Sequence, residues 1–261
     1  MYYNIYIIRR LVMNKIIIAN WKMNKTFGES AEWLEKFNKK FKEKIRKDKT
    51  YKDAVYANEF GIAMPPINLA AHVAFNKIDK LMLVGQDVSQ FPAGPYTGYI
   101  SAEMLSEFGI KYVIVGHSER RKYHYETSCD VNLKAKAALE YNITPLICFG
   151  ESLTEYQQGK SKEVVKQKIL ESSKDIDFSK VIISYEPIWA MGTGQSASPT
   201  FLKDMAEYIR SITSPNTKII YGGSVNAKNI KDLAKIPDIN GFLIGNATLD
   251  LDTFLEVIAV E

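Results

Sequence analysis

Cysteine and histidine are scarce in this chain of 261 residues. Its two cysteines, Cys129 and Cys148, lack C-x-x-C spacing, and its three histidines follow no metal-ligand pattern. We therefore expect no metal site, and a reducing compartment, the cytoplasm, as the location. Cys148 lies in the apolar run PLICFG, so we expect it in the core rather than at a reactive centre.

An excess of one charge is also missing. Lys and Arg total 34 against 30 Asp and Glu, which leaves a net charge of +4. The basic residues are spread along the chain among glutamates rather than gathered in one block, which argues against nucleic acid as a partner. The mild excess favours an anionic substrate, but only weakly. No run after residue 13 approaches the length of a membrane span, so we expect no membrane partner.

Residues 1–13 differ in character from the remainder of the chain. The segment MYYNIYIIRRLV is apolar but short, its arginines follow the apolar stretch, and no small-residue cleavage site comes after it. These features fit neither a signal peptide nor a membrane span. We expect residues 1–13 to be a disordered extension or a start-site artefact, with Met13 as the true start, and residues 14–261 to form one catalytic domain.

Short apolar runs alternate with longer amphipathic stretches from residue 14 onward. The expected strands are 15–20, 60–65, 81–87, 111–117, 144–150, 181–186, 218–223 and 241–245. Continuous rather than alternating apolar runs are typical of parallel strands covered by helices. Eight such units spaced by ~30 residues predict a single-domain α/β fold, the (β/α)₈ barrel. A doubly wound open sheet is the alternative, but the chain has no linker or break in composition.

Residues 46–59 fit this scheme less well. They are longer than a usual helix-to-strand connection, and the segment AVYAN resembles a strand. We place the second strand at 60–65 instead, because Pro65 and Pro66 end it and a helical pattern comes after them.

Active sites of such barrels form at the carboxyl ends of the strands, and polar residues are concentrated there. They are Asn20 and Lys22 after the first strand, His117, Ser118 and Glu119 after the fourth, Glu186 after the sixth, Ser224 after the seventh, and Gly245 and Asn246 after the eighth. Each has an ordinary structural explanation: a solvated lysine, a core histidine, a helix cap. Their coincidence at one rim is what predicts a site.

The chemistry these groups allow is narrow. Glu186 ends a buried strand, and a small-residue segment that could cover it comes after Pro187, as proton abstraction in a water-poor site requires. The glycine turns after the last two strands offer N–H groups to a phosphate. The segment 192–197 fits the dinucleotide-binding pattern G-x-G-x-x-A, which should turn directly from a strand into a helix. Here other residues, Pro187 and Trp189 among them, separate it from the strand, so we expect no nucleotide cofactor.

Six motifs together resemble the triosephosphate isomerase family. They are NWKMN (20–24), VGHSERR (115–121), CFGES (148–152), YEPIWAMGTG (185–194), YGGS (221–224) and GFLIGNA (241–247), and the match covers residues 14–258 in order. The resemblance implies a cofactor-free isomerase of glycolysis and gluconeogenesis. It would interconvert dihydroxyacetone phosphate and D-glyceraldehyde 3-phosphate through an enediolate.

The resemblance also implies catalytic roles. Glu186 would move the proton between two substrate carbons. His117, as neutral imidazole, would polarise the carbonyl and carry protons between the two oxygens. Lys22 and Asn20 would stabilise the substrate and the enediolate, and Glu119 would support the site from behind.

The phosphate and the cover over the site would be held by a second group of residues. By the resemblance, the segment 187–197 is a lid that Tyr221 and Ser224 hydrogen-bond when it closes. The groups expected to hold phosphate through backbone N–H are Gly192, Ser224, Gly245 and Asn246.

Two positions depart from the family pattern. Asn246 stands where the family has a second glycine, so we expect phosphate binding to survive, somewhat weakened. The loop 89–100 matches the family's dimer-forming loop, with Thr97 reaching the neighbour's site. Tyr99 replaces a Glu that pairs with an arginine, here Arg120, across that interface. We therefore expect a homodimer that depends more on packing.

Two other functions are alternatives. Another barrel acting on a sugar phosphate is disfavoured by Lys22 and Glu186 together with the long lid. An inactive barrel kept as a binding protein is disfavoured by the intact Asn20, Lys22, His117 and Glu186. A binding role in addition to catalysis stays open.

Overall fold

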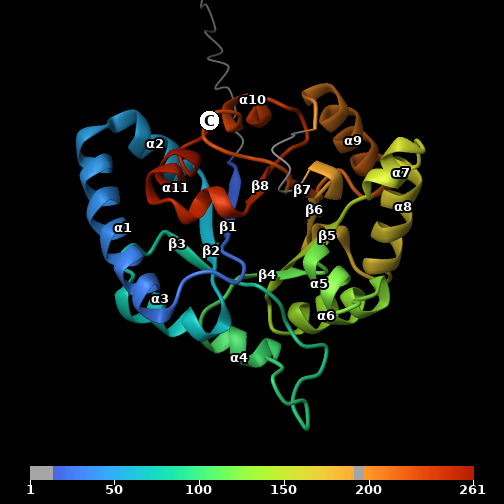
Figure 1. Cartoon of the computed structure of the whole chain (residues 1–261), viewed down its shortest axis with the longest axis horizontal. Coiled ribbons are helices and arrows are strands. Elements are labelled where there is room, and N and C mark those ends of the chain that lie inside the picture. Colours follow the sequence, from blue (N-terminus) through green and yellow to red (C-terminus); the bar gives the residue numbers. More distant parts are fainter. Residues whose placement is uncertain (1–13, 191–196) are drawn as a thin grey trace, which may run out of the picture.

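The computed structural model describes residues 14–190 and 197–261. Within them, eight strands close into a barrel in the order of the sequence, with helices around it (Figure 1). Strand β1 pairs in parallel with both β2 and β8, which excludes the open sheet and confirms the (β/α)₈ barrel. The expectations for residues 1–13 lie outside the described part of the chain.

All eight predicted strands are present, although most are shorter than the apolar runs. They are β1 (Ile16–Asn20), β2 (Glu59–Ala63), β3 (Leu81–Gly85), β4 (Tyr112–Val115), β5 (Thr144–Phe149), β6 (Ile182–Tyr185), β7 (Lys218–Tyr221) and β8 (Gly241–Ile244).

Helices follow the strands and cover the outside of the barrel. The α-helices are α1 (Phe27–Lys47), α2 (Lys49–Ala57), α3 (Leu69–Phe75), α4 (Ala102–Glu107), α5 (Ser118–Tyr123), α6 (Ser128–Glu140), α7 (Leu153–Gln157), α8 (Ser161–Ser172), α9 (Pro199–Ile212), α10 (Ile230–Ala234) and α11 (Leu251–Val257). Four short 3₁₀ turns are η1 (Pro66–Asn68), η2 (Phe178–Lys180), η3 (Ile188–Ala190) and η4 (Asn246–Leu249).

The strands are mostly apolar because both of their faces are buried. One set of side chains fills the barrel interior, among them Ile18, Cys148 and Leu243. The alternate set, which includes Ile17 and Phe242, packs outward against the helices. Cys148 is fully buried and free, so its expected place in the core is confirmed.

Residues 46–59, too long for a simple connection, are mostly helical. Asp48 ends α1 with its N–H bonded to the Lys44 carbonyl, and its side chain caps α2 by accepting the Tyr51 N–H at 2.9 Å. Helix α2 buries Tyr51 and Val55 against the barrel. The second strand starts at Glu59, the last residue of this stretch, so it follows α2 and the segment AVYAN is not the strand.

A loop projects from the described part of the barrel. The loop 89–100 extends below α4 in Figure 1, and its residues 92–99 are exposed. No helix of the described residues is long and apolar enough to span a membrane.

Candidate active site

The parallel barrel carries the predicted side chains to one rim. Asn20 is the last residue of β1, His117 comes two residues after β4, and Glu186 directly follows β6. Gly245 directly follows β8. Because all eight strands run in the same direction, their carboxyl ends, and with them these residues, meet on one side of the molecule.

His117 and Glu186 face each other. His117 Nε2 lies 3.6 Å from Glu186 Oε2, and the two residues are only 6% and 1% exposed. On its other side, His117 Nδ1 accepts the backbone N–H of Glu119 at 3.3 Å. A ring nitrogen that accepts carries no proton, so the hydrogen of a neutral imidazole lies on Nε2, toward Glu186.

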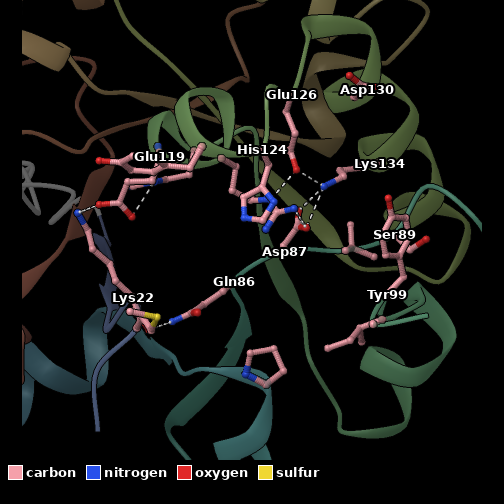
Figure 2. Close-up of a pocket in the computed structure, with 18 of the residues that line it drawn as sticks. Lys22, Gln86, Asp87, Ser89, Tyr99, Glu119, His124, Glu126, Asp130 and Lys134 are labelled. Atoms are coloured by element: carbon pink, nitrogen blue, oxygen red, sulfur yellow. Dashed lines mark hydrogen bonds and ion pairs between the residues drawn. The ribbon is translucent and has the colours of Figure 1, made fainter. Parts of the chain in front are cut away.

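Glu119 contacts two of the other predicted groups. Its Oε1 lies 2.6 Å from Lys22 Nζ, and its Oε2 lies 3.5 Å from His117 Nδ1; Figure 2 shows Lys22 and Glu119 pointing toward each other. The Lys22 and Glu119 side chains are 29% and 43% exposed. An ion pair that water reaches is weak, so an anionic ligand can compete for the ammonium group.

Lys22 is held in an unusual backbone conformation, with a φ of 53°. Asn20 Oδ1 accepts the Lys22 N–H at 3.0 Å. Gln86 Nε2 donates to the carbonyls of Lys22 and Ala63, each at 2.8 Å. Sequence reasoning missed Gln86, although it is the polar residue that follows β3 directly, and the rule used for the other strands would have found it.

The described residues that are expected to hold phosphate lie on the same rim as Lys22. A Cβ atom at Gly245 would lie 3.4 Å from Lys22 Cε, so the end of β8 adjoins the lysine. Asn246 begins η4 and is exposed, whereas Ser224 is half-buried and its Oγ donates to the Ala190 carbonyl at 2.7 Å. Gly192 lies outside the described residues.

The Glu186 side chain is enclosed by small groups. A Cβ atom at Gly222 would come within 2.5 Å of Glu186 Cγ, so only glycine leaves room for the acid. Ser184 Oγ donates to Glu186 Oε1 at 3.1 Å. Burial, followed by the nearby Glu186 charge, raises the pKa of the Cys148 thiol well above its usual value, so the thiol stays protonated beside the carboxylate.

The start of the segment 187–197, the predicted lid, is attached to a buried acid. Glu151 is fully buried and accepts hydrogen bonds from the Tyr185 hydroxyl and, at 2.8 Å, from Trp189 Nε1. Trp189 lies in η3, which begins two residues after Glu186. Burial raises the pKa of Tyr221 to about 12, so its hydroxyl remains a possible donor at neutral pH. Of the predicted lid, residues 191–196 lie outside the described chain.

A cavity of about 870 Å³ opens beside the site (Figure 2). Lys22, His117 and Glu119 border it, together with Asp87 and Lys134. Burial raises the pKa of Asp87, although the nearby cations Lys134 and Arg120 oppose the shift. Among residues 14–190 and 197–261, no group of three or more His, Cys, Asp or Glu is placed to hold a metal ion.

Comparisons with known proteins agree with this geometry. The family model for triosephosphate isomerase matches residues 15–261. The triosephosphate isomerase of Mesomycoplasma hyorhinis is 46% identical over 94% of this chain and 98% of its own length. Those of Mycoplasmopsis pulmonis and Mycoplasma mobile are each 44% identical, over 93% and 94% of this chain and 96% and 98% of their own lengths.

Proposed function

Because the chain belongs to the triosephosphate isomerase family, it interconverts dihydroxyacetone phosphate and D-glyceraldehyde 3-phosphate, and we propose that Glu186, His117 and Lys22 carry out the reaction. The observation that carries this assignment is the 3.6 Å approach of His117 Nε2 to Glu186 Oε2. A base and a neutral donor then adjoin the same small space, which isomerisation next to a carbonyl requires.

Glu186 acts as the base. Its carboxylate removes a proton from the carbon beside the substrate carbonyl, and the electron pair moves onto the carbonyl oxygen to form the enediolate. His117 donates its Nε2 hydrogen bond to the oxygen that becomes negative. The Glu186 carboxylic acid returns the proton to the neighbouring carbon, which was the carbonyl carbon. The hydroxyl proton of the first carbon passes through His117 to the former carbonyl oxygen, so a carbonyl forms on the first carbon and the enzyme ends each turnover in its starting state.

Lys22 and Asn20 supply the electrostatic part of the mechanism. The Lys22 ammonium group is already on the rim, held by Glu119, and can shift its contact to an anionic substrate because that ion pair is partly exposed. Asn20 fixes the Lys22 backbone through the Lys22 N–H. Glu119 thus works through Lys22 and His117 rather than on the substrate itself.

We assign the non-reacting phosphate to the turns after β7 and β8. Ser224, Gly245, Asn246 and Gly192 would hold it through backbone N–H groups, with Lys22 adjoining Gly245 on the same rim. The segment 187–197 would then serve as the lid over the site. Its start is held by Trp189, which donates to Glu151. Excluding water strengthens each electrostatic contact with the enediolate.

The variant Glu186→Asp tests the base. It keeps the carboxylate but withdraws it by one methylene, so we expect turnover to fall by about 10²-fold or more. The measurement is a coupled assay of both triose phosphates, with Glu207→Asp on the exposed face of α9 as control. Near-normal turnover of Glu186→Asp would refute the assignment. Preference for a different sugar phosphate would favour another reaction of this fold.

We also propose a homodimer formed through the loop 89–100. Phe91 and Tyr96 stack with ring centroids 3.9 Å apart, and Tyr99 is 60% exposed. Exposed aromatic rings on a projecting loop favour a protein partner, and the cavity beside the active site could receive them. Thr97, at the tip of the loop, would then reach the neighbour's site.

We place the enzyme in the cytoplasm and in glycolysis. Both cysteines are free thiols, as a reducing compartment requires. Its substrates are the small triose phosphates, and neither the charge distribution nor the site calls for a nucleic acid or a membrane.

A further inference from the structure

Ser184 lies two residues before the acid on strand β6. Successive side chains of a strand alternate between its faces, so Ser184 and Glu186 point to the same side, into the barrel. Ser184 is fully buried, and its Oγ donates to Glu186 Oε1 at 3.1 Å. This bond is not needed to complete the strand, because the Ser184 backbone is already paired with Cys148 on β5 and Ile220 on β7.

The Glu186 carboxylate needs such a donor. At 1% exposure it has lost nearly all contact with water, and an ionised carboxylate in that position is costly unless donors replace the water. Its Oε2 has no hydrogen-bond partner among the described residues and faces His117 Nε2. Oε1 is therefore the oxygen that is held, and Oε2 is the oxygen left free to take a proton.

The other groups around the Glu186 carboxylate are less suited to donate a hydrogen bond to it. Cys148, on β5, offers a thiol, which is a weak hydrogen-bond donor. Arg121, on α5, interacts with the Glu186 charge, but its guanidinium donates to the carbonyls of Gly116 and Cys148 and to Ser172. His117 is the group across the pocket. Ser184 supplies the strong neutral donor.

We propose that Ser184 is a positioning residue for the catalytic base, keeping the Glu186 carboxylate ionised and turned so that Oε2 faces His117 and the substrate. The inference rests on the proposed role of Glu186. It assigns a function to a serine inside the barrel that does not touch the substrate.

Three variants of Ser184 test this role by grading the donor. Ser184→Ala removes it, Ser184→Cys replaces it with a weaker donor of nearly the same size, and Ser184→Thr keeps the hydroxyl. In Ser184→Ala we expect the acidic limb of the pH profile of kcat/KM to move up by about one unit. We expect kcat at the optimum to fall about fivefold, with KM changed less than about twofold because the phosphate contacts are untouched.

The order of the variants separates positioning from packing. The midpoint pH of the acidic limb should be highest in Ser184→Ala and lower in Ser184→Cys. In Ser184→Thr it should equal the wild-type value, even if the added methyl group lowers the melting temperature. Ser30→Ala, a fully buried serine on α1, is the control for losing a buried hydroxyl and should leave the profile unchanged.

Failure of this inference is distinct from failure of the proposed base. If Glu186→Asp is impaired while Ser184→Ala and Ser184→Cys keep the wild-type acidic limb and kcat, the positioning role is wrong and the base stands. The positioning role would also be overturned if the midpoint pH of the acidic limb depended on side-chain size, with Ser184→Thr shifted and Ser184→Cys unchanged. Near-normal Glu186→Asp refutes the base itself.

Discussion

Lys22 has a left-handed backbone conformation that a residue with a long side chain adopts when its surroundings hold it there. The neighbours that hold it are Asn20, which accepts its N–H, and Gln86, which donates to its carbonyl. Gln86 also donates to Ala63, on β2. One amide thus ties the lysine backbone to the barrel, and the position of the ammonium group depends on it.

Replacing Gln86 with Met keeps the length of the side chain and removes both donors. We expect kcat to fall about tenfold, because losing hydrogen bonds to partly buried carbonyls costs about 1–3 kcal/mol and frees the Lys22 turn. Steady-state kinetics and thermal unfolding measure the effect, with the exposed Gln167→Met as control. Unchanged kcat with a lowered melting temperature would mean that Gln86 serves the fold alone.

Residues of this kind were only partly predictable. The side chains at the strand ends, such as His117 and Glu186, could be located from the strand pattern alone. Gln86, which directly follows β3, could have been located by the same rule. Ser184 carries no special signal, because what marks it is the face of the strand that it shares with Glu186. Gly222 is similar, because its role depends on the Glu186 side chain filling the space that a Cβ atom would take.

Helices α1 and α2 show how one residue separates two elements. Asp48 accepts the Tyr51 N–H at the start of α2, and its own N–H caps the end of α1. A residue with an extended backbone between two helical stretches turns one long helix into two. This turn lets Tyr51 and Val55 reach the core.

Asp48→Ala removes the side-chain cap of α2. We expect the free energy of unfolding to fall by about 1 kcal/mol, the usual loss for such a cap, with little change in kcat because the turn is far from the rim. Urea unfolding measures it, and Asp53→Ala, exposed in the same helix, is the matched control. Equal effects of the two variants would argue against capping.

The strands were predictable as elements because burial on both faces leaves an unbroken apolar run. The segment 46–59 was not, since its helical pattern is short and its capping residue, Asp48, resembles any loop aspartate. The second strand follows α2, and its placement could be predicted because Pro65 and Pro66 come soon after its end.

At the scale of the whole molecule, four charged side chains on the wall of the large cavity balance one another within one chain. Arg120 is paired with Asp87 at 2.9 Å and with Glu126, and Lys134 is paired with the same two carboxylates. Figure 2 shows Asp87, Glu126 and Lys134 pointing toward one another. In this cluster two cations are matched by two carboxylates, so Arg120 needs no counter-ion from a second copy.

We therefore expect dissociation of the proposed dimer to respond weakly to salt. Raising the salt from about 0.05 M to about 0.5 M should change its dissociation constant less than about threefold. Screening acts on charge pairs across an interface and not on the burial of exposed aromatic rings such as Tyr99. Sedimentation equilibrium at several salt concentrations measures this. Tyr99→Glu, which adds a carboxylate to the loop, should make dissociation more sensitive to salt than in the wild type. A wild-type dimer weakened tenfold or more by salt would show that an ionic contact joins the two copies, and that the pairing of Arg120 within its own chain is broken on assembly.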